Sequence, residues 1–63
     1  MTDRERVLEA LRDGERTTSA LVGRTGIPPQ RLGRLLASME KAGLIASRWE
    51  GTGLDDVRLW RRA

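Results

Sequence analysis

The sequence predicts a small, mainly α domain in which three helical segments precede a two-stranded β-hairpin. The first observation is an apolar stripe at helical spacing in residues 28–42. The second is the Gly26-Ile27 pair, because a glycine before an apolar residue is typical of a tight turn between helices. The third is the alternation of apolar and polar residues in 44–49 and again in 57–60, which predicts two strands.

The size and composition of the chain narrow the functions that it can have. The 63 residues predict a single domain over 1–63, and a chain this short has a small core. Cysteine and histidine are both absent. Their absence removes disulfides, thiolate metal sites and the commonest general base, so we expect no enzyme, no metal and no cofactor. With no membrane-spanning run of about 20 apolar residues, we expect a cytoplasmic protein.

The first two helices are predicted from caps and apolar spacing. Thr2 or Asp3 can cap a first helix of about ten to twelve residues that a C′ glycine, Gly14, ends. Its apolar stripe consists of Val7, Leu8 and Leu11. Either Thr17 or Thr18 can cap the second helix. Gly23 in its middle predicts close helix packing, and its buried contacts are expected from Ala20, Leu21 and Val22.

The third helix, residues 28–42, has a double-proline entrance. Pro29 is compatible with the first helical position, because that position needs no backbone donor, and Gly43 ends the helix. Its buried stripe consists of Leu32, Leu35, Leu36 and Met39. The other side of this helix carries Gln30, Arg31, Gly33, Arg34 and Ser38.

Turn residues 51–53 separate the two strands, each of which carries one of the two tryptophans of the chain. We expect Trp49 and Trp60 to pair across the hairpin and to cover the edge of the core.

The charge is unevenly distributed along the chain. The total is +3, with −2 in residues 1–15, +5 in 16–48, −3 in 49–56 and +3 in 57–63. The basic excess therefore lies on the central helices and at the C-terminal end, a distribution that favours a nucleic-acid partner.

Two short motifs resemble those of winged helix-turn-helix domains of bacterial regulators, of the MarR, PadR and ArsR type. Thr25-Gly26-Ile27 is similar to the turn before their recognition helix, and residues 39–45, MEKAGLI, are similar to their entry into the wing. The resemblance extends from Arg6 to Trp60. It implies a minimal third strand near 15–17, and double-stranded DNA as the partner of a small transcriptional regulator or accessory DNA-binding factor.

The sequence departs from the family pattern in three places. Pro28 replaces the usual hydroxyl cap of the recognition helix, and Asp55 and Asp56 replace basic residues at the wing tip. The chain also stops soon after Trp60, without the additional helix that dimerises many relatives. Recognition should therefore depend more on helix 28–42 than on the wing.

The candidate DNA contacts follow from docking the 28–42 helix into a major groove, which is wide enough for an α-helix. Gln30 can pair with adenine, and arginines can pair with guanine, so the candidate base contacts are Gln30, Arg31, Arg34 and Ser38. The candidate backbone contacts lie at the ends of the second helix and on the wing strands: Thr17, Thr18, Ser19, Arg24, Arg48 and Arg58.

Two alternatives stay open. The domain can be a protein-interaction winged helix that docks a partner through its first helix or its acidic wing. It can also be the recognition module of a larger DNA translocase or plasmid machine. For the leading hypothesis, the small interface of one module favours a homodimer or paired copies on DNA.

Overall fold

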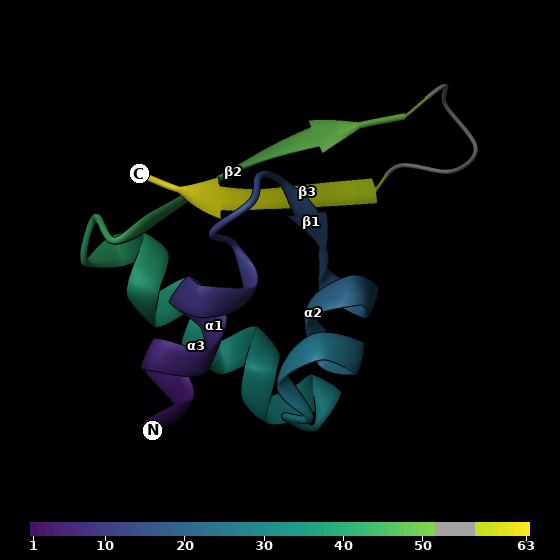
Figure 1. The fold of residues 1–63 in the computed structure, drawn as a ribbon. Helices are drawn as coiled ribbons and strands as arrows, with labels where there is room; N and C mark the ends of the chain where they lie inside the picture. The colour runs from purple at the N-terminus through teal and green to yellow at the C-terminus, as the bar shows by residue number, and fades with distance from the viewer. Residues whose placement is uncertain (52–56) are drawn as a thin grey trace.

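The computed structural model of the chain describes residues 1–51 and 57–63. Figure 1 shows three helices gathered on one side of a small sheet. In chain order, the elements are α1 (Asp3–Ala10), β1 (Arg16–Thr17), α2 (Thr18–Thr25), α3 (Pro29–Lys41), β2 (Ile45–Glu50) and β3 (Val57–Arg62). The predicted wing-tip residues Asp55 and Asp56, and most of the 51–53 turn, lie outside the described residues. None of the described helices is long and apolar enough to cross a membrane.

The sheet has the strand order β1-β3-β2, and both pairings are antiparallel. The two-residue strand β1 pairs Arg16 with Trp60 and Thr17 with Leu59. This pairing confirms the minimal third strand predicted near 15–17. Three helices with a small antiparallel sheet make up a winged helix-turn-helix, so the predicted fold class is confirmed.

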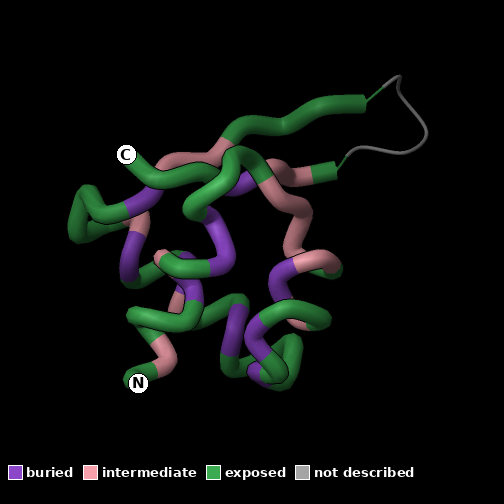
Figure 2. Tube along the Cα trace, viewed as in Figure 1, coloured by how far each residue is buried: buried purple, intermediate pink, exposed green. Residues whose placement is uncertain are grey.

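One hydrophobic cluster holds the helices against the sheet. The buried positions lie on all three helices and on both long strands (Figure 2), and together they form one cluster. Every element except β1 contributes to this cluster, which consists of Val7, Ala10, Leu11, Leu21, Ile27, Leu32, Leu36, Met39, Ile45 and Trp60. The helical stripe predicted for α3 therefore faces the core, with Leu35 partly buried at its margin.

Helix α1 is shorter than the predicted ten to twelve residues. Thr2 caps it through a capping box, in which its side chain accepts from the Glu5 amide and the Glu5 carboxylate accepts from the Thr2 amide. After Leu11 the backbone bonds change to i−3 spacing, from Arg12 to Glu9 and from Gly14 to Leu11. The α-helix therefore ends at Ala10. Gly14, with φ of 134°, belongs to the turn that follows and is not a C′ residue, so this prediction was wrong.

Helix α2 is capped by Thr17, whose hydroxyl accepts a hydrogen bond from the Ala20 amide. Only Leu21 of the three predicted apolar contacts is fully buried, and its neighbours Ala20 and Val22 are half-buried. The predicted close packing at Gly23 was wrong. A methyl group built there meets none of the described residues within 4 Å, because Gly23 lies on the exposed side of the helix.

The Thr25-Gly26-Ile27 turn is as predicted. Gly26 adopts the left-handed conformation with φ of 72° that ends α2, and its amide donates to the Val22 carbonyl. The buried Thr25 hydroxyl donates to the Leu21 carbonyl at 2.6 Å and accepts from the Ile27 amide at 3.2 Å. The buried Thr25 hydroxyl is therefore satisfied both as donor and as acceptor, and Ile27 is fully buried in the core.

Helix α3 has both predicted ends to within one residue. Pro28 is the N-cap residue and Pro29 the first helical residue. At the other end, the Gly43 amide donates to the Glu40 carbonyl and the Leu44 amide to the Met39 carbonyl, which is a Schellman motif. Gly43 has φ of 79°, so a glycine is required to turn the chain from α3 into β2.

The two tryptophans have different environments, and they do not face each other. The hairpin register pairs Trp60 with Ser47 and Trp49 with Arg58. Trp60 is 3% exposed and belongs to the core, whereas Trp49 is 67% exposed. The predicted cross-strand pairing was wrong because the strand register places the two rings two residues apart along the hairpin.

Candidate nucleic-acid interface

The exposed side of α3 carries all four candidate base contacts. Gln30, Arg31, Arg34 and Ser38 are exposed, while the buried stripe of the same helix faces the core. Gln30, Arg31 and Arg34 line one surface hollow of about 260 Å³. The N-terminal half of α3 therefore presents one amide and two guanidinium groups together, and these groups are able to hydrogen-bond base edges.

The two arginines of this hollow have different surroundings. Arg31 Nε lies 3.3 Å from the Oδ2 atom of Asp3 on α1, and both side chains are partly exposed. Among residues 1–51 and 57–63, Arg34 forms no ion pair. Gly33 lies between them on the exposed side, and a methyl group built there meets nothing within 4 Å.

The candidate backbone contacts of α2 lie at its two ends. Thr17 is the helix cap, and the Thr18 hydroxyl accepts from the Trp60 indole nitrogen at 2.9 Å, so both hydroxyls have structural partners. Ser19 is exposed at the start of the helix. Arg24, exposed at the other end, lines a hollow of about 280 Å³ with residues of α1, so it lies beside the first helix.

Arg48 on β2 is held by carboxylates. Its Nε and Nη2 atoms donate to the two carboxylate oxygens of Glu15, at 2.7 and 2.9 Å, and Nη2 also lies 3.2 Å from Glu50. The hydrogen bond from Arg48 lowers the pKa of Glu15, and the same bond raises the pKa of Arg48. A phosphate that bound Arg48 would have to compete with this bidentate pair.

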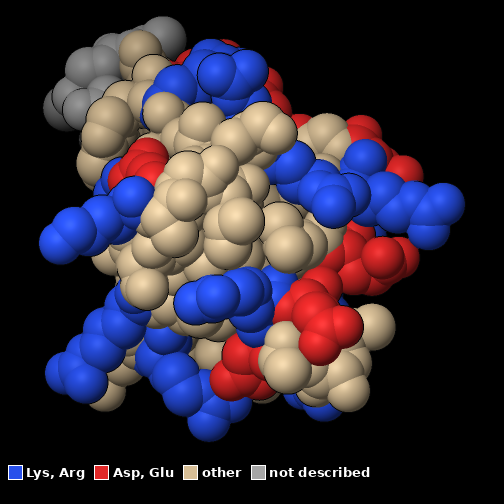
Figure 3. All heavy atoms as spheres, turned by 90° about the vertical axis from the view of Figure 1, so that its left-hand side faces the viewer, with Lys and Arg blue, Asp and Glu red and all other residues tan. Residues whose placement is uncertain are grey.

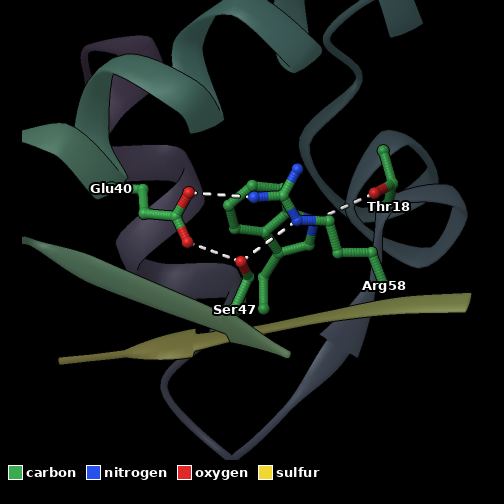
Figure 4. Close-up of polar contacts among 5 residues, drawn as sticks. Thr18, Glu40, Ser47 and Arg58 are labelled. Atoms are coloured by element: carbon green, nitrogen blue, oxygen red, sulfur yellow. Dashed lines mark hydrogen bonds and ion pairs between the residues drawn. The ribbon is translucent and has the colours of Figure 1, made fainter. Parts of the chain in front are cut away.

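Arg58 on β3 lies at the centre of a network that joins the wing to α3 (Figure 4). Its guanidinium donates to Glu40 at 2.9 Å and to the Ser47 hydroxyl at 3.0 Å, and Ser47 donates to the same carboxylate of Glu40. The guanidinium also lies over the Trp60 ring, 4.2 Å from its centroid, and 5.6 Å from that of Trp49. Arg58 is therefore packed and paired within the domain.

Sequence reasoning missed the acidic partners of three candidate arginines. Asp3, Glu15 and Glu40 lie 28, 33 and 18 positions from Arg31, Arg48 and Arg58, respectively. No helical or strand periodicity relates residues at such separations. Of the three carboxylates, only Glu40 had a signal in the sequence, because it belongs to the motif at the end of α3.

Acidic and basic side chains are both present on the surface. Figure 3 shows most of the acidic side chains of one face on its right-hand part, where basic side chains also lie, and further basic side chains project at the lower left. Helix α1 contributes acidic residues in its first turn, whereas the first turn of α3 holds a basic residue and none that is acidic. The first turn of α3 is therefore more basic than that of α1.

The chain is similar to known proteins in sequence and in fold. A sequence model described as MarR family matches residues 6–51. Among solved structures, the chain is similar to Stf76 from the Sulfolobus islandicus plasmid-virus pSSVx, with a TM-score of 0.87, 19% identity, and coverage of 98% of this chain and 82% of the other. It is also similar to M. tuberculosis Rv0081, with a TM-score of 0.85, 25% identity, and coverage of 100% of this chain and 60% of the other. The chain thus spans 60% of the Rv0081 chain. No curated protein matches the sequence.

Proposed function

Since the chain belongs to the MarR family of winged helix-turn-helix proteins, in which such domains are DNA-binding regulators, we propose that it binds double-stranded DNA sequence-specifically. In this proposal α3 enters the major groove, and the protein is a small transcriptional regulator or accessory DNA-binding factor. The observation that carries the proposal is the shared hollow of Gln30, Arg31 and Arg34 on the exposed side of α3.

The chemistry of these side chains suits base recognition. Gln30 can bond adenine through its amide, and Arg31 or Arg34 can bond the O6 and N7 atoms of guanine. Each good bidentate contact of this kind contributes about 1–3 kcal/mol of discrimination against a wrong base. Ser38, one turn further along α3 from Arg34, is the fourth candidate base contact.

We assign the backbone contacts chiefly to side chains that the fold leaves exposed. Ser19 at the start of α2 and Arg24 at its end can reach phosphates without breaking an intramolecular bond that the structure shows. Thr17 and Thr18 keep hydroxyl protons that can still be donated to a phosphate oxygen. Arg48 and Arg58 would first have to leave their carboxylates. We therefore propose that the wing arginines contribute less than α3.

Selection from random DNA duplexes, followed by titration of the selected site at two salt concentrations, tests the proposal. Binding should weaken steeply as salt rises, because each neutralised phosphate contributes about 0.9 to the slope of log K against log salt. Arg34→Ala should relax the preference at particular base pairs, and Arg24→Ala should weaken all duplexes alike. Negligible binding to every duplex, or an unchanged preference in Arg34→Ala, would refute the proposed docking of α3.

One observation favours the second candidate, a protein-interaction winged helix. Two basic side chains of the wing, Arg48 and Arg58, are already neutralised by carboxylates, and the large Trp49 ring beside them is exposed. Aromatic rings are frequent anchors of protein interfaces. The second function would be supported if the wild-type protein selected no duplex and if Trp49→Ala abolished its binding to a partner protein.

We also propose that two copies act together on a repeated or palindromic site. A single small module buries about 600–1,000 Å² on DNA, and two modules on adjacent half-sites would multiply the specificity of one. Measuring the mass of the protein alone and on the selected duplex tests this arrangement. A single copy on DNA at saturation would contradict it.

A further inference from the structure

Arg31, a candidate base contact on α3, faces a carboxylate from a different helix. Its Nε atom lies 3.3 Å from Oδ2 of Asp3, the first residue of α1. The Arg31 side chain is 61% exposed and that of Asp3 is 38% exposed, so both can be reached by a ligand. The acid thus contacts one of the three side chains that line the hollow on α3.

The local structure explains why an acid is favourable at this point. Arg31 is the third residue of α3, where the helix dipole is positive and disfavours a cation. The first turn of α3 holds no acidic residue, and Pro28 provides no side-chain cap. Asp3 supplies the missing negative charge, and it lies between Thr2 and Glu5, which form the capping box at the start of α1.

We propose that Asp3 is a positioning residue that acts through Arg31 and increases the sequence specificity of DNA binding. This inference rests on the proposed function. On an arbitrary duplex, Arg31 could otherwise contact any phosphate. Asp3 competes with that phosphate for the guanidinium and also repels it, so Asp3 weakens non-specific binding.

The same carboxylate interferes less with base recognition. Arginine has five N–H donors, and a carboxylate that approaches at Nε does not require both terminal nitrogens. Those terminal nitrogens can bond guanine O6 and N7 end-on. A guanidinium held at Nε has also lost part of its rotational freedom, so less entropy is lost when it meets the correct base. The contact with Asp3 therefore weakens binding to other sequences more than it weakens binding to the correct site.

A matched control is available on the same helix. Glu9 of α1 forms an exposed ion pair at 3.4 Å with Arg12, which lies three residues further along the chain, just past the end of α1. Asp3→Asn and Glu9→Gln each remove one negative charge and one exposed ion pair, so they change the long-range field by the same net charge. Only the first of the two substitutions releases an arginine of α3. Thermal unfolding of both variants checks that each is folded under the conditions of the assay.

The experiment measures the binding of wild type, Asp3→Asn and Glu9→Gln to the selected duplex and to an unrelated duplex over a range of salt. Compared with Glu9→Gln, Asp3→Asn should bind the unrelated duplex about two- to fivefold more tightly, which corresponds to the usual strength of an exposed ion pair. Its salt slope on that duplex should steepen by about 0.9, the contribution of one additional phosphate contact. Its ratio of specific to non-specific affinity should fall.

Arg31→Gln in the Asp3→Asn background identifies the route of the effect. If Asp3 acts through Arg31, the substitution at Asp3 should have no more effect than the Glu9 control once Arg31 is absent. Equal changes in Asp3→Asn and Glu9→Gln, or an Asp3 effect that persists without Arg31, would overturn the inference. Failure of the wild-type protein to bind any duplex would instead refute the proposed function, so the two failures are distinguishable.

Discussion

Substituting Gly33 by alanine should separate the stability of α3 from its contact with DNA. Gly33 lies in the interior of α3 on its exposed side, and a methyl group built there meets nothing within 4 Å. Alanine is better than glycine in a helix interior by about 1 kcal/mol. For a domain of this size, that gain raises the melting temperature by about 4–8 °C. Gly23→Ala in α2, where the space is equally open, should stabilise the protein by a similar amount.

DNA binding should distinguish these two variants. If α3 lies in the major groove with its backbone close to the bases, the methyl group at Gly33 has to enter a packed interface. Overpacking of this kind costs about 1–3 kcal/mol, or roughly 5- to 150-fold in affinity. Gly23 lies on the other helix of the pair, so Gly23→Ala should bind as the wild type does.

Thermal unfolding followed by circular dichroism, together with a titration of the selected duplex, measures both effects. A Gly33→Ala variant that is more stable and binds DNA as tightly as wild type would show that the backbone of α3 does not approach the groove at this residue. Failure of either variant to gain stability would refute the reasoning that both positions are open and helical.

Three further outcomes are expected from the structure. Trp60 is buried and Trp49 is exposed, so the tryptophan fluorescence of Trp49→Phe comes from Trp60 alone. This fluorescence should be blue-shifted and poorly quenched by acrylamide, and strong quenching would contradict the burial of Trp60. Ile27→Ala should lower the free energy of unfolding, measured in urea, by about 2–5 kcal/mol, because Ile27 is fully buried where the turn enters the core. A loss below about 1 kcal/mol would contradict this burial. The hydrogen bond from Arg48 lowers the pKa of Glu15 in the folded protein below its value in the unfolded chain. The bond therefore stabilises the fold fully above the unfolded pKa of Glu15, and this stabilisation is lost as the pH falls through the lower pKa of the folded protein. Acid should therefore destabilise wild type more than Glu15→Gln, and parallel pH profiles would show that the bond is not formed in solution.

Much of the fold follows from local rules. The α3 boundaries result from Pro29 at the first helical position and Gly43 at the C′ position. Gly26 adopts the left-handed conformation that ends α2, so the position of this turn follows from the glycine and from the residues next to it in the sequence. The side of α3 that faces solvent also follows from local spacing, because a helix with one apolar stripe buries that stripe. The four candidate base contacts could therefore be placed on one exposed surface from the sequence.

The errors concern features that depend on surroundings. Gly14 has the residue type of a C′ cap, but the chain leaves α1 earlier through i−3 bonds. Gly23 suggested a close approach of two helices, yet no atom of residues 1–51 and 57–63 lies within 4 Å of a methyl group built there. A glycine in a sequence shows that the backbone has freedom at that position. It does not show whether the fold uses that freedom.

The sequence by itself determined the order of the elements, the turn into α3 and the exposed position of Gln30, Arg31 and Arg34, because these depend on periodicity and on the conformations that proline and glycine favour. The tertiary structure decided which arginines are paired. Asp3 reaches Arg31, Glu15 reaches Arg48 and Glu40 reaches Arg58 only after the helices pack and the strand register forms. The register likewise made Trp60 a core residue and left Trp49 exposed. Ion pairs between residues distant in the chain depend on how whole elements pack, and no local pattern specifies that packing.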